Sequence, residues 1–159
     1  MSNLEQTLSI IKPDAVERNL ENEIKEMFKN KGFSILKEKK IQIEKSEAEK
    51  FYKVHETKPF YNDLCTYLSS GPIVVMVLEK DNAVLGNREL MGATNPKDAQ
   101  KGTIRKIYGI SIDKNSVHGS DSVENAKIEI DFFFKDWITS WLLLDIACAL
   151  ESKLFLLTI

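Results

Sequence analysis

The near-continuous apolar run Ile73–Leu78 is the segment that most constrains how this chain can fold. It follows Gly71-Pro72, a pair that ends a preceding helix, and all of its side chains are apolar. A near-continuous apolar run of this kind is expected to be a buried central strand. The remaining segments must therefore supply neighbouring strands and covering helices.

The other segments are expected to alternate between strands and helices. Thr7–Lys12 is a short apolar strand, and Pro13 ends it and holds Lys12 in an extended conformation at the strand end. A helix at 21–30 that ends at Gly32 and a strand at 33–43 are expected next. A Ser46-x-x-Glu49 capping box then opens a helix that carries Phe51, Tyr52 and His55. The remaining expected elements are helices at 61–70 and 82–91, a short helical or strand-like piece at 103–108 within the irregular stretch 92–117, and a helix followed by an apolar strand within 123–134. This order is compatible with an α+β fold, a ferredoxin-like split βαβ antiparallel sheet with helices packed on one of its faces.

The composition limits how an anionic ligand could be bound. The 159 residues suit one domain with a sizeable core, and the net charge of −2 does not indicate a general nucleic-acid binder. Positive charge must then be supplied locally. Only three arginines, Arg18, Arg88 and Arg105, occur among the 22 basic residues. The chain also lacks a Walker A loop and a Gly-x-Gly-x-x-Gly motif, so a nucleotide would require a different architecture.

Residues 115–122, Asn-Ser-Val-His-Gly-Ser-Asp-Ser, surround one of the two histidines of the chain with small hydrogen-bonding residues. On its own, His118 would more often be a histidine of a surface loop. Upstream, however, Gly92-Ala-Thr94 and Gly102-Thr103-Ile-Arg105 are rich in donors, and Arg88 and Arg105 flank them. A histidine near donors suited to phosphate oxygens is what phosphoryl transfer through an N-phosphohistidine requires.

These motifs resemble those of the nucleoside diphosphate kinase family. The resemblance also includes Thr7-Leu-Ser-Ile-Ile-Lys-Pro-Asp14 and Phe51-Tyr52-x-x-His55 followed by Pro59-Phe60, and it covers roughly residues 5–134 in order. It implies an enzyme that moves the γ-phosphate of a nucleoside triphosphate to a nucleoside diphosphate by a ping-pong route through His118. It further implies low specificity for base and sugar, and a homo-oligomer, a tetramer or hexamer built from dimers.

The resemblance assigns a role to each matched residue. His118 would be phosphorylated, Glu129 would fix its imidazole and Ser120 would act as an intermediary. Lys12 would be the fourth catalytic residue and would also bind the nucleotide. The nucleotide-binding residues would be Lys12 and Asn115 at the sugar hydroxyls and phosphates, Arg88, Thr94 and Arg105 at the phosphates, Tyr52 and His55 along the pocket, and Phe60 under the base. Mg²⁺ would bridge the substrate phosphates with few or no direct protein ligands.

Each assignment has a structural alternative when the residue is taken alone. Phe60 could belong to the core, Tyr52 and His55 could form a half-buried helix face, and Glu129 could make a surface salt bridge. Lys12 could be a solvated strand end. For the whole chain, the main alternative is a nucleotide-binding or regulatory module without useful turnover. Sequence-specific DNA binding is disfavoured by the negative net charge.

The sequence divides into a kinase-like domain at 1–134 and a C-terminal extension at 135–159. Sixteen of the 25 residues of the extension are apolar, and Trp137, Trp141, Leu144 and Cys148 recur at helical spacing. Either an additional helix packed on the domain or on a partner subunit, or a segment unrelated to the rest of the fold, explains this composition. A membrane span is not expected, because Asp145 and Glu151 interrupt the apolar runs.

Two features indicate a cytoplasmic location. Cys65 and Cys148 are far apart and lack metal-ligand or redox spacing, so both are expected to be buried thiols in a reducing compartment. The first residues, Met-Ser-Asn-Leu-Glu, have neither the basic nor the apolar region of a secretory signal.

Overall fold

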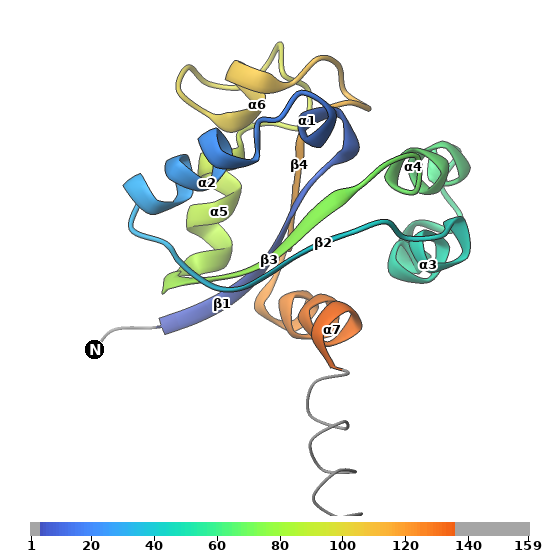
Figure 1. The fold of residues 1–159 in the computed structure, drawn as a ribbon, viewed down its shortest axis with the longest axis horizontal. Helices are drawn as coiled ribbons and strands as arrows, with labels where there is room; N and C mark the ends of the chain where they lie inside the picture. The colour runs from blue at the N-terminus through green and yellow to red at the C-terminus, as the bar shows by residue number, and fades with distance from the viewer. Residues whose placement is uncertain (1–3, 136–159) are drawn as a thin grey trace, which may run out of the picture.

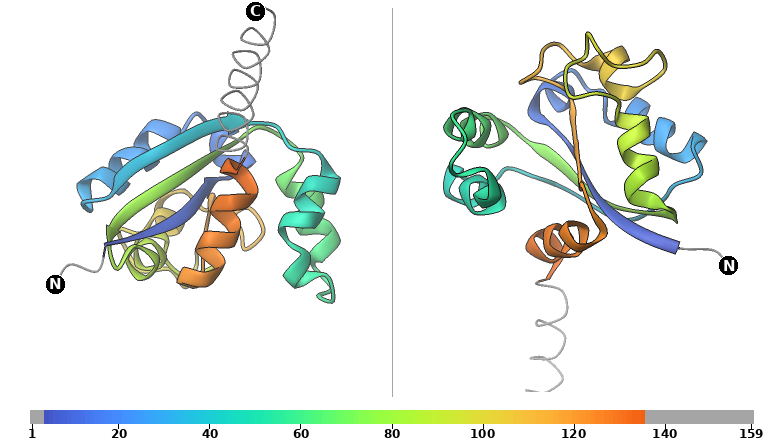
Figure 2. Two further views of the ribbon diagram at one scale, coloured as in Figure 1. Left: turned by 90° about the horizontal axis from the view of Figure 1, so that it is seen from below. Right: turned by 180° about the vertical axis from the view of Figure 1, so that it is seen from behind.

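A computed structural model describes residues 4–135 and shows a twisted antiparallel sheet with helices on both faces (Figures 1 and 2). Its strands are β1 (Leu4–Ile11), β2 (Ser34–Ile41), β3 (Ile73–Asp81) and β4 (Val117–Gly119), in the order β2-β3-β1-β4. All three strand pairings are antiparallel. The structure therefore confirms the ferredoxin-like α+β sheet, and the run Ile73–Leu78 lies in β3 between two other strands.

The helices are α1 (Pro13–Glu17), α2 (Glu21–Asn30), α3 (Lys45–Phe51), α4 (Tyr61–Leu68), α5 (Ala83–Met91), α6 (Ile104–Tyr108) and α7 (Val123–Phe134), with a 3₁₀ helix, η1, at Lys53–His55. Helices α1, α2, α5 and α6 pack with Ile11 and Met76 on one face of the sheet. Helices α3, α4 and α7 pack with Ile10 and Val75 on the other face (Figure 1). The prediction of helices on one face is wrong, because consecutive residues of β1 and β3 are buried and both faces need cover.

The prediction for the segment 123–134 is also wrong. It is a single helix, and the fourth strand is the preceding Val117–Gly119, which contains His118. The Ser122 hydroxyl caps α7 by accepting the Asn125 N–H at 3.1 Å, and this cap continues the chain into a helix. A strand of three residues is too short to show an alternating pattern, so the sequence did not reveal it.

Helix α3 differs from its prediction at both ends. It begins at Lys45, and the capping interaction joins the Glu44 N–H to the Glu47 carboxylate at 2.9 Å instead of using Ser46 and Glu49. The helix ends at Phe51, and His55 lies in η1. An acidic residue at the cap position hides this helix start from a search for serine or threonine.

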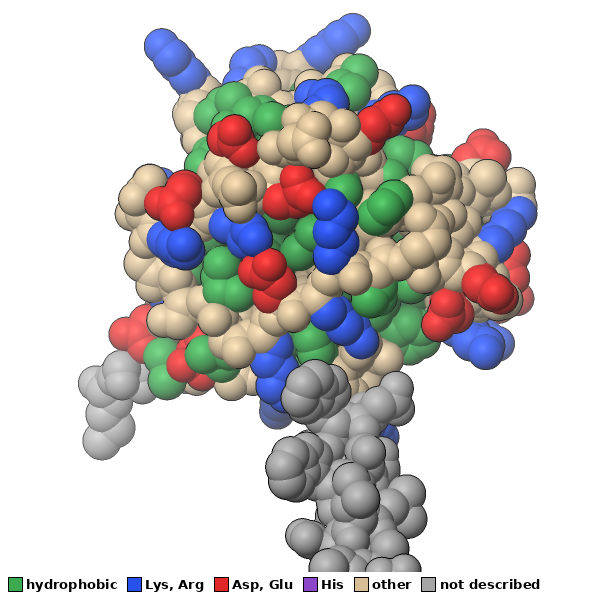
Figure 3. Space-filling view, in the orientation of Figure 1, with side chains coloured by type: hydrophobic (Ala, Val, Ile, Leu, Met, Phe, Trp, Pro, Cys, Tyr) green, Lys and Arg blue, Asp and Glu red, His purple; other side chains and the backbone are tan. Residues whose placement is uncertain are grey.

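The remaining observations concern Cys65, the turn at Asn19, the C-terminal stripe and the charge on the surface. Cys65 is buried, as predicted, and Asn19 has a left-handed φ of 57°, a conformation that asparagine tolerates. The expected stripe from Trp137 to Cys148 lies outside the described residues. Within 4–135, none of the helices is long and apolar enough to cross a membrane. On the face shown in Figure 3, acidic and basic side chains are intermixed.

Candidate active site

Strand pairing and one carboxylate fix the position of His118. The β4–β1 pairing places His118 opposite Ile10, and its Nε2 lies 3.1 Å from Oε1 of Glu129 in α7. The other carboxylate oxygen accepts a 2.6 Å hydrogen bond from the Ser120 hydroxyl. That hydroxyl also accepts the Leu8 N–H at 3.2 Å, which ties Ser120 to β1. Glu129 therefore engages one ring nitrogen, and Nδ1 has no hydrogen bond with any residue of the described segment.

Two aromatic rings flank the imidazole. The ring centroid of Phe51 lies 5.3 Å from that of His118 with the planes at 70°, and the Tyr52 ring lies at 5.8 Å and 75°. Phe51 also contacts the rings of Phe132 and Phe133 on α7. The His118 side chain keeps 18% of its surface exposed, so the imidazole is oriented but accessible.

Lys12 lies at the end of β1 in an extended conformation, as predicted, with φ −78° and ψ 164°. Its side chain is buried, and its Nζ donates a 2.9 Å hydrogen bond to Oδ1 of Asn115. The Asn115 amide donates in turn to the carbonyls of Thr94 at 3.2 Å and Ile112 at 2.9 Å. Burial first, and the nearby Arg105 second, lower the pKa of Lys12 from 10.5 to about 8.

Arg105 holds the loop after α5 against β4. Its guanidinium donates to the carbonyl of Gly92 at 2.9 Å and to that of Val117 at 3.0 Å, and its Nε is buried without a partner in the described part of the chain. Gly92 has a φ of 81°, and a Cβ there would lie 2.5 Å from the Thr103 hydroxyl oxygen, so glycine is required. Burial and then Arg88 lower the pKa of Arg105 to about 10, so the guanidinium stays charged at neutral pH.

The segment from α3 to α4, the α3–α4 hairpin, places Tyr52 beside His118, and the rings of His55 and Phe60 follow in succession from Tyr52. The buried Tyr52 ring lies 6.1 Å from the His55 ring, which lies 6.1 Å from the ring of Phe60. Phe60 is 49% exposed, so it does not fill the core. Burial, and then the charge of Glu129, raise the pKa of the Tyr52 hydroxyl, which therefore remains a protonated donor.

The residues predicted from the sequence thus gather around one corner of the sheet, although they come from distant segments. Electrostatic contact links Arg105 to Lys12, Tyr52 and Arg88, and ring contacts link Tyr52 to His118. Arg88 and Thr94 are exposed at the rim of this cluster.

Phe51 is a residue whose contact the sequence reasoning missed. It entered only as part of the Phe51-Tyr52-x-x-His55 motif, and its ring nevertheless approaches the His118 ring more closely than Tyr52 does. The signal available was an aromatic pair at the end of a helix, which is equally typical of a core.

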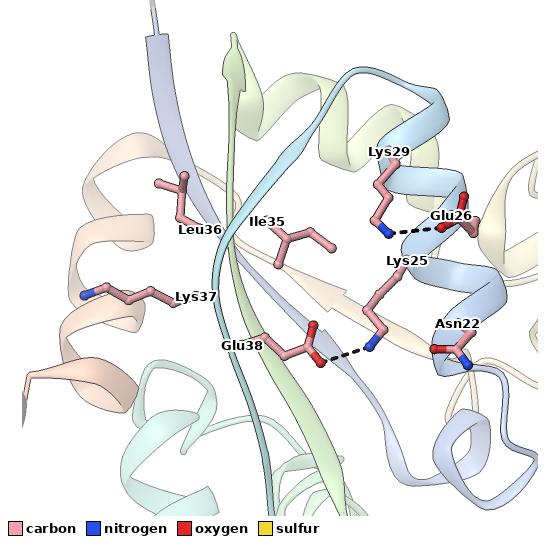
Figure 4. A pocket seen from close by; sticks show the side chains of 8 residues that line it. All are labelled: Asn22, Lys25, Glu26, Lys29, Ile35, Leu36, Lys37 and Glu38. Atoms are coloured by element: carbon pink, nitrogen blue, oxygen red, sulfur yellow. Dashed lines mark hydrogen bonds and ion pairs between the residues drawn. The ribbon is translucent and has the colours of Figure 1, made fainter.

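A surface pocket between α2 and β2 is separate from this corner. It is lined by Asn22, Lys25, Glu26, Lys29, Ile35, Leu36, Lys37 and Glu38 (Figure 4). Two of its lysines are already paired, Lys25 with Glu38 at 2.9 Å and Lys29 with Glu26 at 3.0 Å. The pocket contains none of the predicted site residues, so the candidate active site remains the corner at His118.

Sequence comparisons identify the family of this chain. A family model described as nucleoside diphosphate kinase matches residues 5–137. The nucleoside diphosphate kinase of Campylobacter jejuni is 58% identical over 132 residues, which cover 83% of this chain and 96% of the relative. That of Geotalea uraniireducens is 56% identical over 131 residues, with 82% and 96% covered.

Solved structures indicate the same family. The crystal structure of the Aquifex aeolicus nucleoside diphosphate kinase superposes with a TM-score of 0.81 at 40% identity, covering 82% of this chain and 95% of that one. The apo enzyme of Encephalitozoon cuniculi gives 0.78 at 38% identity, covering 84% and 99%. The chain therefore belongs to the nucleoside diphosphate kinase family and is a phosphotransferase that acts on nucleotides.

Proposed function

We propose that the enzyme transfers the γ-phosphate of a nucleoside triphosphate to a nucleoside diphosphate by a ping-pong route through phospho-His118. The observation that carries this proposal is the contact of Nε2 with Glu129. A carboxylate at Nε2 keeps the proton on that nitrogen, so the lone pair on Nδ1 is available to attack phosphorus. Rotation of the ring is restricted by Phe51 and Tyr52, which supports an in-line approach.

The proposed reaction has two symmetrical halves. Nδ1 of His118 forms a bond to the γ-phosphorus while the bond from that phosphorus to the β–γ bridging oxygen breaks. The nucleoside diphosphate then leaves. A terminal oxygen of the second diphosphate then attacks the same phosphorus, and Nδ1 leaves with its electron pair. Glu129 stabilises the positive charge that the imidazole carries in the intermediate, and Ser120 holds the carboxylate in place.

The surrounding donors suit a polyphosphate. Arg88, Arg105 and Lys12 supply positive charge, and Thr94 and Asn115 supply hydrogen bonds to phosphate or sugar oxygens. The donors are cationic or neutral, and the nearby Glu129 is already hydrogen-bonded, so this set fits phosphate oxygens better than a bare metal ion. We therefore propose that Mg²⁺ enters with the nucleotide, held mainly by its phosphates, where it offsets their charge.

A partial reaction tests the proposed route. The protein is incubated with γ-labelled ATP and Mg²⁺ in the absence of a diphosphate acceptor. We expect about one label per subunit, released by acid and retained in alkali, and its full transfer to a diphosphate added later. A nucleotide-binding module without turnover would take up no label, and acid-stable label would rule out phosphohistidine.

The lowered pKa of Lys12 predicts an alkaline limit to activity. Below pH 8 the ammonium is charged and attracts phosphate, and above pH 8 it loses its proton, so kcat/KM should fall as the pH rises through about 8. Bound polyphosphate favours the charged form of Lys12, so kcat should fall at a higher pH than kcat/KM does. The pH profile of the Lys12→Arg variant is the control. Because a guanidinium stays protonated, the alkaline fall in kcat/KM of this variant should move above pH 10. Superimposable limbs in the two proteins would show that another group titrates.

Phe60 is expected to bind the base by stacking, because its ring is exposed beside His55. Phe60→Ala should raise KM by a similar factor for all common bases, with about 1–3 kcal/mol of binding lost. The measurement is KM for a series of diphosphates, with Val54→Ala, a change of another exposed residue on the same hairpin, as control. A loss confined to one base would mean that hydrogen bonds, not stacking, recognise the nucleotide.

We further propose that residues 1–134 form the catalytic domain, that the protein acts in the cytoplasm, and that it assembles from dimers into a tetramer or hexamer. Three isoleucines in α6 and in the segment between α6 and β4 are each more than half exposed; they are Ile107, Ile110 and Ile112. The sequence beyond Phe134 contains sixteen further apolar residues, and large exposed apolar patches are rare on soluble monomers. Light scattering in solution tests the assembly.

A further inference from the structure

Asp14 makes contacts that reach well beyond helix α1, in which it lies. Its carboxylate is buried and receives hydrogen bonds from two distant segments. The Tyr67 hydroxyl of α4 donates to one oxygen, and the Ser116 hydroxyl donates to the other at 3.0 Å. Asp14 therefore joins α1, the α3–α4 hairpin and the segment that leads into β4.

Ser116 occupies the position where such a contact has the greatest consequence. It lies between Asn115, which holds the Lys12 ammonium, and the strand that carries His118. Its φ is 71°, a left-handed conformation that a residue with a Cβ adopts only when its surroundings hold it there. Its carbonyl accepts the Lys12 N–H at 2.9 Å, so the conformation of Ser116 also sets the backbone on which Lys12 is mounted.

Arg18, the arginine that the nucleotide site does not use, completes this arrangement. Its guanidinium donates to the Asp14 carboxylate at 2.9 Å and to the Ser116 hydroxyl at 3.2 Å. It also donates to the Tyr108 carbonyl at the end of α6, at 2.8 Å. The cation therefore balances the buried carboxylate and ties it to the helix that carries Arg105.

We propose that Asp14 is a positioning residue for phosphoryl transfer: by holding Ser116 in its left-handed conformation, it keeps Lys12, Asn115 and His118 in register. The proposal rests on the function proposed above. Asp14 itself touches Ser116, Tyr67 and Arg18 and acts on the reaction only through them. Its loss should therefore slow the chemical step even when nucleotide is saturating, because small displacements of reacting groups lower rates by up to about 100-fold.

A double-mutant cycle on the single-turnover rate tests this proposal. The variants are Asp14→Asn, Ser116→Ala and the double substitution, and the rate of label incorporation from saturating ATP with Mg²⁺ is measured per folded subunit. We expect Asp14→Asn to be roughly 10- to 100-fold slower. The double variant should be no slower than Asp14→Asn alone, because both changes remove the same interaction. Asp63→Asn, which alters an exposed acid on α4, should react like the unaltered protein.

Each alternative result has a defined meaning. A rate for Asp14→Asn within twofold of the unaltered protein, or effects that multiply in the double variant, would overturn the proposal. If Asp14→Asn does not fold, Ser116→Ala decides, because alanine keeps the Cβ that disfavours the left-handed conformation while the hydroxyl contact to Asp14 is lost. A full rate in Ser116→Ala would then overturn the proposal. Absence of label on the unaltered protein would instead reject phosphohistidine chemistry.

Discussion

Substitution His118→Ala is expected to lower nucleotide turnover by at least about 10⁴-fold, because it removes the atom that carries the phosphoryl group between substrates. The surrounding cations and Phe60 remain, so nucleotide affinity should change little. The fold should also tolerate the change, since the imidazole is partly exposed and bonded to a single carboxylate.

Two measurements on this variant separate catalysis from binding. A coupled assay reports turnover, and calorimetric titration with a diphosphate reports affinity. Turnover near that of the unaltered protein would contradict the proposed mechanism. Loss of both turnover and affinity would show that His118 contributes to binding before it contributes to chemistry.

Substitution Lys12→Met is expected to lower kcat by about 10²–10³-fold. Methionine is close to lysine in shape, but it removes the charge that we propose binds the phosphates, together with the hydrogen bond to Asn115. Losses of this size are typical when one preorganised donor to a developing charge is removed. The midpoint of thermal unfolding should change little, because a buried ammonium is itself costly and its removal offsets the lost hydrogen bond.

Lys114→Met is the matched control for this experiment. Lys114 is the neighbour of Asn115 in the sequence, but its side chain is exposed. We expect nearly unchanged kcat in the control, since an exposed charge is screened by solvent and salt. Equal losses in both variants would mean that overall positive charge, not the buried position of Lys12, is what the reaction needs.

Features governed by local patterns were predictable from the sequence. The helix predicted at 21–30 has the same bounds in the structure, because its apolar residues recur at helical spacing and Gly32, with φ 81°, permits the turn that follows. The strand Ile73–Leu78 was equally clear. The motif around His118 identified the histidine, and the arginine spacing identified the donor-rich loop.

Features that depend on tertiary contacts were not predictable. The strand β4 is only three residues long and exists because Ile10 and His118 pair across the sheet. Helices on the second face follow from the burial of β1, which no local pattern of Thr7–Lys12 reveals. The proposed role of Asp14 depends on Ser116, 102 positions away, so no local pattern in the sequence could reveal it.

The site of phosphorylation on the imidazole is the most direct test of the account. The protein is labelled with ¹⁵N-histidine, phosphorylated with ATP and Mg²⁺, and studied by ³¹P–¹⁵N correlated NMR in alkali. Because Nε2 faces Glu129 at 3.1 Å, we expect phosphorus on Nδ1 of His118. Phosphorus on Nε2, on His55 or on another residue would contradict it.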